Sequence, residues 1–350
     1  MKDLGKGFVE MVEVGEDGAG QRLDNFLLKR LKGAPQSLIY RIIRAGEVRV
    51  NKGRAAPLTK LAIGDLVRVP PVRLDQPTRL VGGAGTRVRP AASQVRAGAD
   101  LEILFEDDAL LAINKPSGLA VHGGSGVSYG VIEALRAARP DAKFLELVHR
   151  IDRDTSGVLL LAKKRSALVG MHALLREGRT DKRYLTLVKG NWPHPAKHHI
   201  RTALAKYVTE AGERRVAQAD EEEYSKDAHT IFNVIKRFGS GASAATLLEA
   251  QIKTGRTHQI RVHLAGAGFP IAGDDKYGDF GFNKAEAKHQ LKRMFLHAAK
   301  ISFIHPLTEL RLRIEAPLPP DCLRYLSARY PAEPLPAPVV TLRNAHDPTI

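Results

Sequence analysis

The chain has 350 residues, 43% of them apolar and 6% aromatic, with 54 Lys and Arg against 38 Asp and Glu, a formal net charge of +16. The length allows about two domains, and the apolar content excludes a wholly disordered chain. No run of about 18 apolar residues could span a membrane, and the start lacks the blocks of a secretory signal, so we expect a soluble, cytoplasmic protein. Because Cys322 is the single cysteine, an intramolecular disulfide and a cysteine-based zinc site are excluded.

The positive charge is concentrated near the N-terminus. Residues 21–73 contain twelve Lys and Arg but three acidic residues, and so carry +9 of the +16. This distribution favours a polyanionic partner whose phosphates the cations neutralise. A basic helix pair with a purely structural role is the alternative. The candidate nucleic-acid contacts are Arg22, Lys29, Arg30, Arg41, Arg44, Arg49, Lys52 and Arg54.

The same segment has the pattern of a small α+β module. Apolar residues recur at helical spacing in 23–31 and, after Pro35, in 38–43, while alternation in 48–50 and 66–69 predicts two strands. The sequences GQRLDNFL, PQSLIYRIIRAGEVRVNKGR and GDLVRV resemble the S4 RNA-binding module. The resemblance implies that residues 21–73 dock RNA, after an N-terminal extension at 1–20.

Two segments lack a hydrophobic period. Residues 74–99 are rich in Gly, Ala and Arg, which is typical of a linker, and residues 331–350 form a Pro-rich tail. The segment between them, residues 100–330, is expected to form the second domain.

Within the second domain, helices are predicted at 131–139 and 167–177, the latter with Ser166 as its N-cap. Strand-like runs do not alternate regularly with these helices, which argues against a doubly wound parallel sheet. We expect a mixed, largely antiparallel sheet flanked by helices. The strand-like runs lie at 110–113, 158–161, 185–188 and 247–252.

A pair of acidic residues lies in LVHRIDRDTSGVLLLAKKRSAL, at 147–168. Asp152 and Asp154 are two residues apart, with Arg150 and Arg153 beside them. A carboxylate that acts as a nucleophile must stay ionised, and an adjacent guanidinium lowers a carboxyl pKa by roughly 1–3. Asp152 has this setting. However, Asp-Thr-Ser-Gly is a common turn composition, and spacing alone favours a turn for both acids.

Four motifs in order resemble one enzyme family. HRIDRDTSGVLLLAK is similar to the motif of the RluA-type pseudouridine synthases, in which the Asp after His-Arg-Leu/Ile is the catalytic nucleophile. The other blocks are NKPSGLAVHGGSG at 114–126, KRYLTLVKG at 182–190 and TGRTHQIRVHLAGAGFPIAGDDKYG at 254–278. The resemblance implies an α+β catalytic domain after the S4-like module. It also implies an isomerase that converts uridines of large-subunit (23S) ribosomal RNA to pseudouridine without metal or other cofactor.

The resemblance also implies roles for catalytic residues. Asp152 would act at the ribose, either by attacking C1′ or by removing a 2′ proton in a glycal route. Tyr184 would pack against the uracil and help to remove the C5 proton, whereas without the family it would be interpreted as a half-buried strand residue. Arg261, on a predicted helix capped by Thr257, would pair with Asp152. A surface arginine is the alternative.

Further residues are implied to bind RNA. Arg150 would fill the gap that an extracted uridine leaves in its stack, or else neutralise nearby carboxylates. Arg256 would support Asp152 or contact phosphate, and the glycine run after His122 would bring backbone close to phosphate. The expected partner is large-subunit ribosomal RNA, free or in assembling particles, and the expected state is a monomer without protein partners or membrane. A non-catalytic assembly factor is the alternative, and its function should survive Asp152→Ala.

Overall fold

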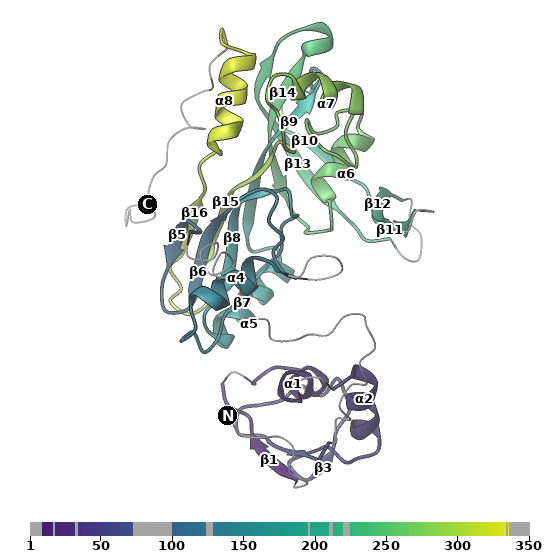
Figure 1. Cartoon of the computed structure of the whole chain (residues 1–350), viewed down its shortest axis with the longest axis vertical. Coiled ribbons are helices and arrows are strands. Elements are labelled where there is room, and N and C mark those ends of the chain that lie inside the picture. Colours follow the sequence, from purple (N-terminus) through teal and green to yellow (C-terminus); the bar gives the residue numbers. More distant parts are fainter. Residues whose placement is uncertain are drawn as a thin grey trace. The chain divides into compact units, whose positions relative to one another are not determined.

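The computed structural model describes residues 9–16, 18–31, 34–72, 100–123, 129–194, 197–209, 213–219, 225–333 and 335. They form two compact units, one up to residue 72 and a larger one from residue 100 (Figure 1). The linker predicted at 74–99 and most of the predicted tail lie outside the described residues. No helix in the described ranges is long and apolar enough to cross a membrane.

The N-terminal unit packs two helices against a four-stranded antiparallel sheet, in the strand order β1-β4-β2-β3. Its core contains the apolar faces predicted for both helices, with Leu23, Leu27 and Ile39 fully buried. The elements are β1 (Glu10–Glu13), α1 (Leu23–Arg30), α2 (Gln36–Arg44), β2 (Arg49–Val50), β3 (Gly53–Arg54) and β4 (Leu66–Val69).

Strand β1 was not predicted from the sequence. It lies in the segment assigned to an extension and pairs with β4, from Glu10 opposite Val69 to Glu13 opposite Leu66. Only Val12 of this strand is buried. One buried residue gives no alternation of apolar and polar residues from which a strand could be predicted. The pairing with β4 alone identifies β1 as a strand.

The larger unit is built on one ten-stranded sheet. Its order is β10-β13-β14-β9-β15-β8-β6-β5, with β16 also paired to β15 and β7 to β8. Every pair is antiparallel except β15 with β8, which confirms the mixed, largely antiparallel sheet. The strands are β5 (Ile103–Glu106), β6 (Leu110–Lys115), β7 (Glu146–Leu147), β8 (Ser156–Ala162), β9 (Asp181–Lys189), β10 (His198–Arg201), β13 (His229–Phe238), β14 (Ala245–Ile252), β15 (Leu296–Ile304) and β16 (Arg311–Glu315).

Helices cover both faces of this sheet (Figure 1). Along β9, Tyr184 and Val188 belong to a core shared with α4 and α6, whereas Leu185 and Leu187 pack with α7 and α8 on the other face. Because side chains alternate along a strand, Tyr184 faces the side that also contains Ile151. The helices are α4 (Val131–Ala138), α5 (Arg165–Arg176), α6 (Gln259–Gly266), α7 (Phe280–Ala287) and α8 (Pro320–Arg329), and a separate hairpin consists of β11 (Leu204–Val208) and β12 (Arg214–Gln218).

Two predicted helix caps are wrong. Helix α5 begins at Arg165, so Ser166 lies inside its first turn. Helix α6 begins at Gln259, and its N-cap is His258 rather than Thr257, with a left-handed φ of 53°. The Gln259 side chain reaches back and accepts the Arg256 N–H at 3.1 Å, which satisfies a donor at this helix start without Thr257.

A glycine permits the close contact of the two central strands. Gly157, the second residue of β8, has a φ of +108°, and a Cβ at this position would lie 2.2 Å from the carbonyl oxygen of Ala298 in β15. The Gly of Asp-Thr-Ser-Gly is therefore required by the parallel β8–β15 pair. This pair places the loop before β8 next to β15, which also pairs with β9.

Candidate active site

Asp152 lies in the loop between β7 and β8. Its backbone carbonyl accepts the Thr155 N–H at 3.2 Å, so the segment makes the turn that its composition indicates. Its side chain is 25% exposed and is 3.3 Å from Nη1 of Arg261. The turn indicated by the composition and an ion pair with Arg261 therefore both occur at Asp152.

Arg261 is held from two sides. Its Nε and Nη2 each donate to a carboxylate oxygen of Asp274 at 2.7 Å, which leaves Nη1 to face Asp152. Both Arg261 and Asp274 are almost completely buried. Burial opposes the charge of Arg261, but the hydrogen bonds to Asp274 raise its pKa above the ordinary value. Arg261 thus presents a fixed positive charge to a carboxylate that solvent can reach.

Tyr184 lies on β9 and is only 8% exposed. Burial raises the pKa of its hydroxyl, and the charge of Asp152 raises it further. The phenol therefore stays protonated at neutral pH, with its ring on the face of the sheet that contains Ile151. Tyr184 is thus a strand residue that is buried rather than half-buried, and its hydroxyl lies within range of the Asp152 charge.

A buried lysine at the end of β6 holds the Asp152 loop. Nζ of Lys115 donates to the carbonyls of Pro116, Leu119 and Arg153 at 2.7 to 2.9 Å. Burial lowers the pKa of Lys115 to about 7, while the charge of Asp154 partly offsets that effect. The three bonds tie the backbone next to Asp152 to the NKPSG segment.

The sequence reasoning missed three of these residues. Asp274 and Lys115 lie inside the family blocks that were recognised, yet nothing in their spacing marks them as partners of Arg261 and of the loop. His258 was not singled out, but its Nε2 lies 3.9 Å from a carboxylate oxygen of Asp152. Within the described ranges, no group of three or more His, Cys, Asp or Glu is arranged to hold a metal ion.

Other predicted residues are not brought to Asp152. Arg150 is exposed and makes no hydrogen bond or ion pair among the described residues. The Arg256 guanidinium donates to the carbonyl of Asp227 at 2.9 Å, away from the carboxylate. His122 is exposed, and the N–H of the following Gly123 donates to Glu133 at 3.1 Å, so this amide is already used inside the protein. Residues 124–126 of the glycine run lie outside the described part.

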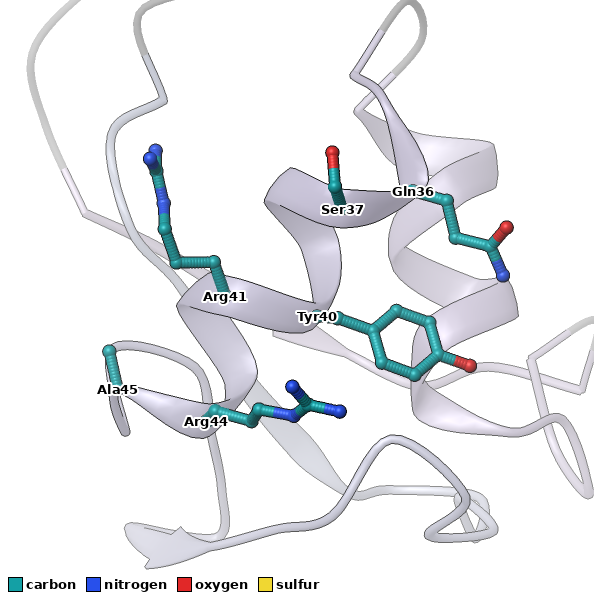
Figure 2. A pocket seen from close by; sticks show the side chains of 6 residues that line it. All are labelled: Gln36, Ser37, Tyr40, Arg41, Arg44 and Ala45. Atoms are coloured by element: carbon teal, nitrogen blue, oxygen red, sulfur yellow. The ribbon is translucent and has the colours of Figure 1, made fainter.

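In the N-terminal unit, one face of α2 borders a shallow hollow (Figure 2). Arg41 and Arg44 are exposed there, and the Arg44 guanidinium carbon lies 5.8 Å from the centre of the Tyr40 ring. The Tyr40 hydroxyl donates to Asp24 at 2.9 Å, which fixes the ring beside the two arginines. The hollow has a volume of about 800 Å³ and is lined by Gln36, Ser37, Tyr40, Arg41, Arg44 and Ala45.

Seven of the eight predicted cations of this unit fall into two groups. Arg22 is paired with Asp24 and Arg30 with Glu10, so these charges are partly neutralised within the protein. Five others are exposed and form no ion pair with any described residue, namely Arg41, Arg44, Arg49, Lys52 and Arg54. Lys29 is exposed as well.

Comparison with known proteins shows which family the chain belongs to. The family model described as RNA pseudouridylate synthase matches residues 109–266, which contain Asp152, Tyr184 and Arg261. The protein named ribosomal large subunit pseudouridine synthase C of Pasteurella multocida is 52% identical over 322 residues, covering 91% of this chain and 94% of that protein. The chain belongs to the RNA pseudouridylate synthase family. The RluA-type resemblance predicted from the four motifs is confirmed, and the protein is an isomerase.

Further comparisons agree with a pseudouridine synthase. The protein of the same name from Escherichia coli K12 is 53% identical, covering 89% of this chain and 93% of that protein. An S4 domain model matches residues 21–67, which confirms the S4-like module. The solved structure of human RNA pseudouridylate synthase domain containing 4 has a TM-score of 0.54 at 25% identity, covering 68% of this chain and 95% of that one.

Proposed function

We propose that this pseudouridine synthase isomerises specific uridines of large-subunit ribosomal RNA, with Asp152 as the group that acts on the ribose. The observation that carries the assignment is the arrangement of Arg261, which Asp274 clamps so that one nitrogen faces a solvent-accessible Asp152. An ionised carboxylate that is both held and accessible suits nucleophilic or base chemistry. The proposal for the RNA rests on the names of the relatives.

The reaction requires little beyond correctly placed side chains. The bond between ribose C1′ and uracil N1 breaks, the base rotates, a bond from C1′ to C5 forms, the C5 proton leaves, and N1 takes up a proton. Asp152 either attacks C1′ or removes a 2′ proton in a glycal route, and Tyr184 packs against the uracil and assists loss of the C5 proton. The two routes differ at the ribose alone, so the same site residues serve both.

RNA recognition is proposed to involve the exposed cations. The target uridine must leave its stack, and the exposed Arg150, two residues before Asp152, is proposed to fill the gap. Arg256 and His122 are proposed to contact phosphates, and the S4 module to dock the RNA. We further propose that the enzyme acts as a monomer in the cytoplasm, where ribosomal RNA is its partner.

The test is carbodiimide-stop mapping of pseudouridine on unmodified large-subunit ribosomal RNA incubated with the protein and no added cofactor. New stops on this RNA, absent from small-subunit RNA and transfer RNA treated in parallel, are expected and would name the target uridines. Precursor particles are included because folded RNA presents different uridines. Binding of all these RNAs and particles without any new stop would contradict the proposal and favour the non-catalytic assembly factor.

Replacing Arg41 and Arg44 together by alanine is expected to weaken RNA binding and to lower its salt dependence. Each lost phosphate contact reduces the slope of log affinity against log salt by about 0.7–0.9. The double variant should therefore lose about 1.4–1.8 from the slope. Binding is measured by filter retention across a salt series, with Arg41→Lys, Arg44→Lys as the charge-matched control. An unchanged slope in the alanine variant would remove α2 from the proposed RNA surface.

A further inference from the structure

His258 presents one ring nitrogen to Asp152 and the other to Tyr277. Its Nε2 lies 3.9 Å from Oδ1 of Asp152, and its Nδ1 lies 2.8 Å from the hydroxyl of Tyr277. The residue has a φ of +53°, a left-handed conformation in which Asn, Asp and His are the most enriched residues after Gly. The hydrogen bond to Tyr277 holds the ring in this position.

The Tyr277 hydroxyl is the hydrogen-bond partner of Nδ1 of His258, and this bond bears on which ring nitrogen carries a proton. This hydroxyl accepts the Val216 N–H of β12 at 3.0 Å, so its own hydrogen is available for Nδ1 of His258. Burial lowers the pKa of His258, and the ring is neutral at pH 7. A neutral ring that accepts at Nδ1 carries its hydrogen on Nε2, which faces Asp152. The charged groups around the ring are Asp152, Arg261, Asp274 and Lys276.

Tyr277 also supports the second partner of Asp152. The guanidinium carbon of Arg261 lies 5.1 Å from the centre of the Tyr277 ring, within the range of a cation–π contact. The segment that contains Tyr277 is itself attached to the hairpin, because Nη1 of Arg215 donates to the Lys276 carbonyl at 3.2 Å and Lys276 pairs with Glu213. One tyrosine thus contacts both side chains that approach the Asp152 carboxylate.

We infer that Tyr277 and His258 are positioning residues for Asp152. Tyr277 holds His258 in the tautomer whose Nε2–H faces the carboxylate, and this hydrogen, together with Nη1 of Arg261, orients Asp152 for its reaction at the ribose. The inference rests on the proposed role of Asp152. It assigns a function to a histidine for which the sequence analysis predicts no role.

A double-mutant cycle on the full-length protein tests this relay. His258→Asn removes the donor that faces Asp152 and tolerates the left-handed backbone, and it should lower kcat about tenfold with KM unchanged. Tyr277→Phe keeps the ring against Arg261 and should lower kcat about fivefold. If the hydroxyl acts through His258, adding Tyr277→Phe to His258→Asn should lower kcat by less than about twofold. Such a small additional loss is expected when two sites are fully coupled.

Two further variants separate positioning from a structural role. His258→Gln restores an amide N–H near the position of Nε2 and should recover most of the lost kcat, whereas a structural role would not distinguish Gln from Asn. Tyr207→Phe, on the exposed strand β11, is the matched control and should match the unsubstituted protein. Melting temperatures establish that each variant is folded.

Defined outcomes would overturn the inference. The relay is refuted if Tyr277→Phe costs as much in the His258→Asn background as alone, or if the losses lie in KM. Asp152→Asn in the same assay separates this failure from that of the proposed function. If the Asp152→Asn protein is inactive while the His258→Asn protein has normal kcat, only the relay is refuted. If the Asp152→Asn protein is active, the role of Asp152 on which the relay depends is refuted.

Discussion

Asp152→Asn should lower the single-turnover rate of uridine isomerisation by at least about 10⁴-fold, in the range seen when an enzyme loses its nucleophile. Asparagine has the shape of aspartate, so the loop that Lys115 holds should remain in place. Its amide is neither a nucleophile nor a base, and the other exposed acid at Arg261, Asp275, pairs with Nη2 at 3.4 Å rather than with the Nη1 that faces Asp152. The rate is measured as release of tritium from RNA labelled at uridine C5.

The matched control for this prediction is Asp154→Asn. The Asp154 carboxylate pairs with Nε of Arg153 at 3.0 Å and makes no contact with Arg261 among the described residues. This variant should keep its rate within about tenfold, because it removes only an ion pair with Arg153, whose side chain is 56% exposed. RNA affinity should be maintained in both variants. Equal losses of rate in the two variants would mean that the turn as a whole, and not the Asp152 carboxylate, is required.

Arg261→Ala should reduce both stability and activity. The guanidinium is the ion-pair partner of Asp274, whose side chain is 1% exposed, and removing one member of a buried pair costs about 3–5 kcal/mol. The free energy of unfolding should fall by about that amount in urea denaturation. The same change leaves Asp152 without its charged partner, so isomerisation should be lost as well. Arg256→Ala, an exposed arginine five residues earlier, should change stability by less than about 0.5 kcal/mol.

The stability loss of Arg261→Ala should depend on pH. Burial opposes ionisation of Asp274, but the hydrogen bonds from Arg261 lower its pKa below the ordinary value, so the pair contributes stability above the pKa of the unfolded chain. Without Arg261, burial raises the pKa of Asp274, so the carboxyl takes up a proton as the pH falls. The free-energy cost of burying an unpaired charge then disappears. The difference between the two proteins should therefore be largest near pH 7 and shrink toward pH 4. A difference that is constant with pH would contradict the assignment of the cost to Asp274.

The amino-acid sequence by itself determined the fold class and the reaction class. Hydrophobic period located the helices of the N-terminal unit and the main strands of the sheet, because those elements bury one regular face. The four motif blocks identified the family, since their residues are constrained by the same chemistry wherever they occur. The block around Asp152 identified the candidate nucleophile for the same reason, although its turn composition alone favoured a structural role.

Only the tertiary structure decided how the site is held. Asp152 and Arg261 are 109 residues apart in the chain, and the clamp by Asp274 and the three carbonyls around Lys115 have no local pattern. The hydrogen bond from β12 to Tyr277, which directs His258 toward Asp152, joins residues 61 apart. The spacing of residues within a segment predicts only the local structure of that segment. The partner of a buried charge depends instead on which strands and loops the sheet brings together, and burial makes that partner essential.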